Sequence, residues 1–135
     1  MTLPDIIARL EKATTGDREL DSRIHLVAIG IPGFESSWRH SVFSENIDKW
    51  CKHGEINQVA KNHGIPEYSS SIDAALALLP GESFWMIGSG LHKLASASRR
   101  AAQPWARIGD GPDTPGATSA IAICIAALKA RETLA

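Results

Sequence analysis

The spacing of apolar residues changes near residue 80, and this change constrains the fold more than any other feature of the chain. Before it, apolar residues recur three and four positions apart, which is the period of an amphipathic helix. This period predicts helices at Leu3–Ala13, Asp17–Ala28 or Ile29, Ser44–Lys52, Glu55–His63 and Ser71–Leu79. The two middle helices lie in an irregular excursion at about residues 31–66, which glycine and proline interrupt.

Beyond residue 80, short apolar runs bounded by turn residues predict strands instead. These strands are Phe84–Gly88, Leu91–Ala97 and Trp105–Ile108, with Ser89–Gly90 as a hairpin loop and Gly109–Gly116 as a turn-rich loop. A closing helix is expected at about residues 117–131, where one apolar face is formed by Ala117, Ile121, Cys124, Ile125 and Leu128. Cys124 is interpreted as a small buried hydrophobe of this helix.

This order of elements predicts a single α+β domain over residues 1–135, with a small antiparallel sheet covered by helices. Helices on both faces would give three layers, an alpha/beta/alpha sandwich, and helices on one side would give two. In the helix at Ser71–Leu79, Ser70 with Asp73 resembles a capping box, and Ser69 is the alternative cap. Its buried stripe is expected to comprise Ile72, Ala75, Leu76 and Leu79.

Composition excludes several classes of protein. The chain has 135 residues, 44% of them apolar, which is enough for a packed core. Its formal net charge of -1 argues against a protein that mainly coats nucleic acid or an anionic membrane. No apolar stretch approaches the length of a transmembrane helix. Because there is no signal-peptide pattern and the two cysteines lie far apart, we expect a cytoplasmic protein.

No group of residues has the spacing of a catalytic or metal site. Cys51, His53 and His63, with His40 or Glu55 as a fourth ligand, do not match a standard zinc motif, so no metal and no cofactor are expected. The acids are assigned to helix starts and turns rather than catalysis; they are Asp17, Glu19, Asp21, Asp73, Asp110 and Asp113. We therefore expect no catalytic residues. A weaker alternative is an enzyme that uses His40, His53 or His63 as a base.

The segregation of charges along the chain is the feature of this sequence that is least typical of an ordinary globular protein. Between Ser83 and Gly109 there is no acid, whereas basic and aromatic residues are interleaved; they are Trp85, His92, Lys93, Arg99, Arg100, Trp105 and Arg107. Such a segment could contact an acidic protein through Arg and Trp, which are frequent at interface hot spots. It could also bind phosphates and stack bases. The plain alternative places the tryptophans in the core and the basic side chains in solvent.

Three segments resemble a known family. Ile7–Ala13 followed by Asp17–Asp21, the run Tyr68–Pro80, and Gly116–Arg131 are similar to parts of small phage and prophage proteins, the phage ABA-sandwich domain family. The resemblance covers most of the chain except about residues 31–66, and Gly30–Phe34 departs from the family pattern. It implies an alpha/beta/alpha fold and a phage-linked origin, with no catalytic residues to carry over.

The function expected from these observations is that of a non-enzymatic phage- or prophage-derived accessory protein. It would act by contact with a host or virion protein through the segment 83–109. The alternative is a nucleic-acid-associated protein that uses the same segment. Neither the identity of the partner nor the oligomeric state follows from the residues.

Overall fold

The computed structural model describes residues 3–28, 40–79, 85–88, 104–109 and 111–134. Along these residues the elements are α1 (Leu3–Lys12), α2 (Arg18–Ala28), α3 (His40–Lys52), α4 (Ile56–Asn62), α5 (Ile72–Leu76), β1 (Trp85–Gly88), β2 (Trp105–Ile108), β3 (Thr114–Pro115) and α6 (Ser119–Leu134). The predicted α+β class is confirmed, because these helices pack on a small antiparallel sheet.

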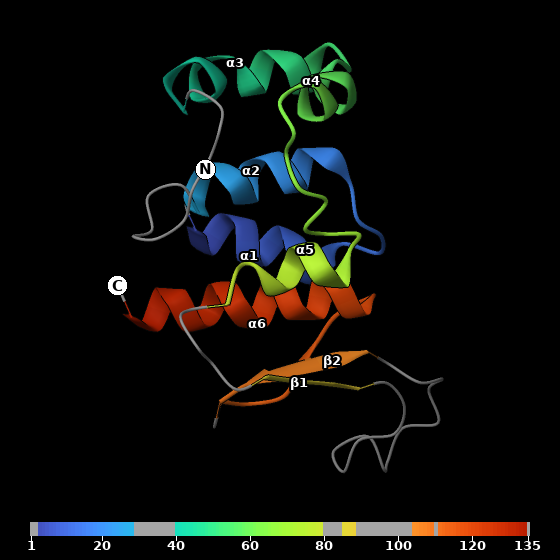
Figure 1. Ribbon diagram of the computed structural model, residues 1–135, viewed down its shortest axis with the longest axis vertical. Coiled ribbons are helices and arrows are strands. Elements are labelled where there is room, and N and C mark those ends of the chain that lie inside the picture. The colour runs from blue at the N-terminus through green and yellow to red at the C-terminus, as the bar shows by residue number, and fades with distance from the viewer. Residues whose placement is uncertain (1–2, 29–39, 80–84, 89–103, 110, 135) are drawn as a thin grey trace.

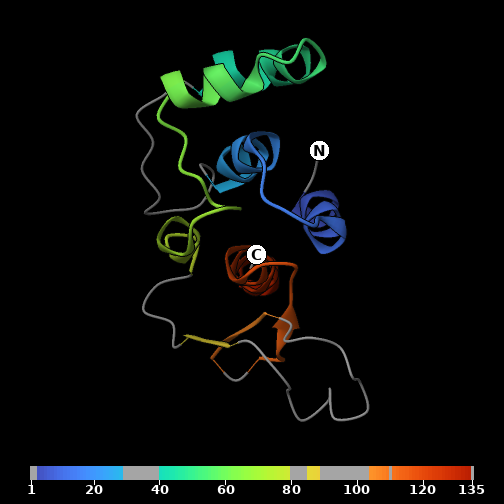
Figure 2. The ribbon, with the colours of Figure 1, turned by 90° about the vertical axis from the view of Figure 1, so that its right-hand side faces the viewer.

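The elements are stacked along the long axis of the molecule. In Figures 1 and 2 the sheet lies at one end, α6 runs across it, α1, α5 and α2 lie beyond α6, and α3 and α4 form the opposite end. The described helices therefore all lie on one side of the sheet, which is the second of the two arrangements that the sequence left open. α6 contacts the sheet as well as α1 and α5. This explains why every residue from Ala120 to Leu128 is buried.

Antiparallel pairing places β2 between β1 and β3. Trp85 pairs with Ile108 and Gly88 pairs with Trp105, while Ala106 pairs with Thr114 of β3. β3 lies where the sequence predicted only a turn-rich loop, because two residues of that loop extend the ladder beside β2. The strand predicted at Leu91–Ala97 and the turn at Ser89–Gly90 lie outside the described residues.

Local capping chemistry sets the helix ends. The side chain of Asp17 accepts a hydrogen bond of 2.7 Å from the N–H of Leu20, which makes Asp17 the N-cap of α2 as expected. α5 is capped by Ser71, whose hydroxyl accepts from Ala74, so both predicted caps, Ser69 and Ser70, are wrong. α5 is also shorter than predicted, and Ile72 is 39% exposed rather than buried.

Two hydrophobic clusters hold the fold together. The main core joins α1, α2, α5 and α6 to the inner face of the sheet. A smaller cluster lies between α2, α3 and α4 and comprises Ile47, Ile56, Ala60 and Ile65, with Leu26, Trp50, Cys51 and Val59 packed against it. α2 is therefore the helix that connects the two clusters. Among the described helices, none is both long and apolar enough to cross a bilayer.

Candidate functional site

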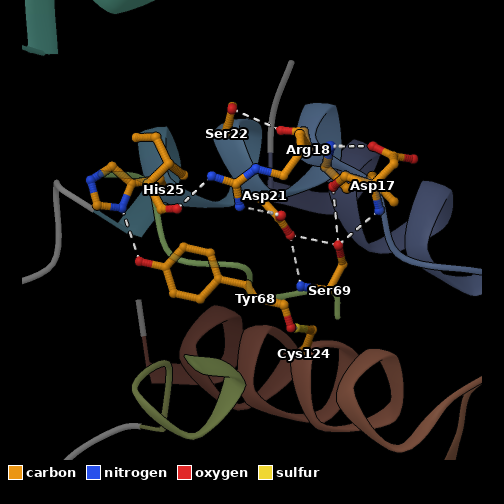
Figure 3. Close-up of polar contacts among 10 residues, drawn as sticks. Asp17, Arg18, Asp21, Ser22, His25, Tyr68, Ser69 and Cys124 are labelled. Carbon is orange, nitrogen blue, oxygen red and sulfur yellow. Dashed lines mark hydrogen bonds and ion pairs between the residues drawn. The ribbon is translucent and has the colours of Figure 1, made fainter. Parts of the chain in front are cut away.

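A buried polar cluster is centred on Asp21, which is fully buried on α2 (Figure 3). Its Oδ1 accepts hydrogen bonds from the hydroxyl and, at 2.7 Å, from the backbone N–H of Ser69. Its Oδ2 accepts from Arg18 Nη1 at 2.8 Å. Burial raises the pKa of Asp21, while the bonds from Ser69 and Arg18 act against that rise.

The same cluster ties two segments together that are distant in the sequence. Arg18 donates through Nη2 to the carbonyl of Ile65 at 2.7 Å, and the N–H of Asp17 donates to the hydroxyl of Ser69 at 3.0 Å. These bonds fix the chain between α4 and α5 against α2. Each polar group named here has a partner within the protein, so the cluster is built to position backbone rather than to hold a ligand.

A second buried contact extends the cluster toward α6. His25 Nδ1 and the hydroxyl of Tyr68 lie 2.9 Å apart, and both side chains are buried. Cys124 donates its S–H to the carbonyl of Tyr68 at 3.0 Å. Burial raises the pKa of Tyr68 and of Cys124, so both stay protonated at neutral pH. Burial confirms the prediction for Cys124, and its S–H adds a bond that the sequence did not indicate.

An open depression of about 300 Å³ borders this cluster between the α1–α2 connection, α5 and the start of α6. Its lining includes Ser69 and consists of Thr15, Gly16, Ser69, Ser70, Ile72, Thr118, Ser119 and Ala120. These residues carry hydroxyls but no acid, base or imidazole. The depression therefore offers hydrogen bonds without a group that could transfer a proton at neutral pH.

We expect the buried imidazole to make folding stability depend on pH. Burial lowers the pKa of His25 from 6.5 to about 4. Between these values the unfolded chain binds a proton that the folded chain does not, so stability falls as pH decreases from about 6.5 toward 4. Urea unfolding at several pH values in this range gives the free energy of unfolding of the wild type and of His25→Gln. The change of this free energy with pH should differ between the two proteins by up to about 1.4 kcal/mol per pH unit.

Comparing the wild type with His25→Gln removes the contribution of Asp21, whose raised pKa changes stability with pH in the opposite direction. His53→Gln, at an exposed histidine, controls for the loss of an imidazole from the surface. The prediction would be contradicted if the free energies of unfolding of the wild type and His25→Gln changed with pH in parallel.

The sheet has a second surface, on the side away from α6. Ala106 is buried, and Ile87 and Ile108 pack against the main core, so they form the inner face. Side chains alternate along a strand and cross-strand partners share a face. The opposite face, here termed the outer sheet face, therefore carries Met86, Gly88, Trp105 and Arg107.

Close packing organises this outer sheet face. The indole of Trp105 lies over Gly88, where a Cβ would be only 2.6 Å from the ring. The guanidinium of Arg107 lies 5.9 Å from the Trp105 ring centroid and also pairs with Asp113. Met86 is 53% exposed. Trp85, at the end of β1, is 45% exposed, but it pairs with Ile108 and so lies on the other face of the sheet. The result is an apolar patch with one neutralised cation.

Three of the residues that the sequence singled out lie in the sheet. Trp105 and Arg107 are in contact on the outer sheet face, whereas Trp85 lies at the other end of the β1–β2 ladder, paired with Ile108. His92, Lys93, Arg99 and Arg100 lie outside the described residues. The pairing of Arg107 with Asp113 shows that an acid-free stretch of sequence can still receive a counter-charge from the following loop. Met86 was not predicted, although its position between Trp85 and Ile87 in an alternating strand was a usable signal.

Three of the residues that the sequence analysis weighed as metal ligands lie near the connection between α3 and α4. Cys51 is half-buried at the end of α3, His53 is exposed in the following turn, and His63 follows α4 with its ring 6.2 Å from Trp50. Within the described parts of the chain, no three His, Cys, Asp or Glu side chains are placed to hold one metal ion.

No protein-family model, no curated protein and no solved structure matches this chain. The resemblance to the phage ABA-sandwich domain family therefore stays a prediction that rests on the three sequence segments alone.

Proposed function

We propose that this protein is a non-enzymatic accessory protein, derived from a phage or prophage, that docks a protein partner on the outer sheet face. The observation that carries this proposal is the exposure of Met86, 53%, on a face that it shares with Trp105 and Arg107. Exposed clusters of this kind are typical of interaction sites. The described helices lie on the other side of the sheet, so they leave this end open (Figure 2).

The composition of the patch supports a protein partner more than a nucleic acid. Trp, Met and Arg are enriched in protein interfaces, and aromatic anchors contribute most of their binding energy. Nucleic acid would require cations that can pair with phosphates. Arg107, the one cation of residues 83–109 that the structure describes, is already paired with Asp113. A host or virion protein with an apolar patch is therefore the partner that fits.

The proposal predicts a loss of partner binding without a loss of stability. Met86→Ala should weaken binding by about tenfold or more, as expected for a hot-spot side chain. Trp85→Ala, at an exposed residue of the same strand whose side chain points to the other face, should have a smaller effect. Because both side chains are exposed, the midpoint of thermal unfolding should change little. Affinity capture from host lysate with wild type and variants, followed by titration of the captured protein after purification, measures both effects.

Ile72→Ala is the matched control, since Ile72 is also an exposed large apolar side chain but lies on α5. It should retain the partner. If the same proteins bind equally to all three variants, the outer sheet face is not the docking site.

A further inference from the structure

α3 and α4 are joined in a way that suggests a use separate from the sheet. The connection is only residues 53–55, and Gly54 in it has a φ of 72°, in the left-handed region that favours glycine. The N–H of Glu55 donates to the carbonyl of Trp50 at 2.8 Å, which closes the end of α3. In Figure 1 α3 is seen along its length and α4 along its axis, whereas Figure 2 shows α4 along its length. The two helices therefore cross rather than lie side by side.

A third helix supports this pair from below. Ile47 of α3 and Ile56 and Ala60 of α4 form the small hydrophobic cluster against Leu26 of α2. The ion pair between Arg23 and Asp48 adds a link of 2.9 Å between α2 and α3. Among the described elements, α3 and α4 contact only each other and α2. Two crossed helices, a short turn with glycine and a supporting helix are the parts of a helix-turn-helix unit.

The surface of α4 that faces away from this cluster is made of polar side chains. Asn57, Gln58, Lys61 and Asn62 are all exposed. Their spacing of one, four and five positions places them on one side of the helix, opposite Ile56 and Ala60. We term this set the α4 polar face. It contains no acid, and the nearest one in sequence is Glu55 at the start of the helix.

We propose that α3 and α4 form a helix-turn-helix unit that binds double-stranded DNA, with the α4 polar face in the major groove. Asn and Gln each present one donor group and one acceptor, the pattern that reads adenine, and Lys contacts guanine or a phosphate. The side-chain amide of Gln58 donates to Asn62 at 2.9 Å, which holds two of these amides in register along the helix. An amide-rich face with a single lysine suits base edges better than an acidic protein.

The charge of the protein sets the strength of this binding. The α4 polar face has one cation, Lys61, and the whole chain has a net charge of -1. Non-specific affinity, which depends on cations that replace phosphate counterions, is therefore expected to be weak and clearest at low salt. Base contacts would then supply most of the discrimination between sequences.

The experiment selects duplexes from a random library with the full chain in 50 mM salt and then measures affinity for the selected duplex by fluorescence anisotropy. The double variant Asn57→Ala, Gln58→Ala should bind the selected duplex on the order of tenfold to a hundredfold more weakly. Lys61→Ala should weaken binding to every duplex and reduce the salt slope by about 0.9. Lys12→Ala, at an exposed lysine in the last turn of α1, is the matched control and should bind like the wild type.

Far-ultraviolet circular dichroism of each variant should show an unchanged helix content, because alanine favours helices. The proposal is overturned if no sequence is enriched, if single-stranded DNA of the selected sequence binds equally well, or if Lys61→Ala behaves like Lys12→Ala. The proposed protein-docking function does not depend on these results, because the sheet and α4 lie at opposite ends of the molecule (Figure 1).

Discussion

Replacing Asp21 by alanine is expected to lower the free energy of unfolding by about 3–5 kcal/mol, because it leaves a buried network without its central acceptor. Three donors would lose Asp21 as their acceptor, namely the hydroxyl and N–H of Ser69 and Nη1 of Arg18. The Ser69 hydroxyl would keep the carbonyl of Asp17, and Arg18 Nη2 would keep the carbonyl of Ile65. Arg18 is itself mostly buried, with 18% of its side chain exposed. Chemical denaturation at neutral pH measures the change.

Asp48→Ala is a matched control for this substitution. Asp48 also pairs with an arginine of α2, at 2.9 Å against 2.8 Å for Asp21, but its side chain is 87% exposed. The carboxylate of Asp48 lies in solvent, and Arg23 keeps a second partner in Glu19 at 3.0 Å, so Asp48→Ala should cost no more than about 1 kcal/mol. The contrast isolates the burial of the carboxylate from its pairing with an arginine. Equal effects of the two substitutions would show that the Asp21 network does not stabilise the fold.

A double-mutant cycle tests whether Asp21 and Ser69 act as a unit. Residues in one hydrogen-bond network usually show coupling of about 0.5–3 kcal/mol. Ser69→Ala in the Asp21→Ala background should therefore cost much less than Ser69→Ala in the wild type. Additive effects would mean that Ser69 is held by its other contacts, such as the bond from the N–H of Asp17.

The sequence predicted those parts of the fold that depend on local spacing. Buried residues at Ile6, Ile7 and Leu10 follow the helical period, and the predicted α1 and the structure agree almost to the residue. Asp17 was expected to open α2, and its side chain caps the helix. Such features depend on residues within one or two turns, so they can be read without knowledge of the tertiary structure.

The polar cluster could not be predicted in full because its partners are far apart in the sequence. Ser69 is separated from Asp21 by 48 positions, and a run of three serines before α5 gives no local reason to choose the last as the cap. One signal was available. Asp21 and His25 share the helical stripe of Leu20 and Ile24, and a polar residue on a buried stripe implies a partner.

The candidate surfaces show the same limit. The turn at Gly54 and the two short helices beside it could be predicted from glycine and apolar spacing. Their crossed arrangement depends on how Ile47 and Ala60 pack over α2, which is a tertiary property. Likewise, the outer sheet face follows from the register between β1 and β2, which places Met86 beside Arg107.

Ile123→Ala and Ile125→Ala are each expected to destabilise the protein by about 2–5 kcal/mol, the usual cost of this truncation in a core. The apolar face predicted from the sequence contains Ile125 but not Ile123. In the structure α6 is covered on several sides, by the sheet, α1 and α5, and both side chains are buried. A helix that is apolar all round is typical of such a central position.

The control is Ala117→Ser, at a residue that the sequence assigned to the apolar face and that is exposed just before α6. It should change the free energy of unfolding by no more than about 0.5 kcal/mol, as for an ordinary surface substitution. Denaturant unfolding of the three variants distinguishes a helix α6 that is buried on several sides from one that is buried on a single face. If α6 were buried on one face only, Ile123→Ala would resemble Ala117→Ser, and the stacking of α6 between the sheet and the other helices would be wrong.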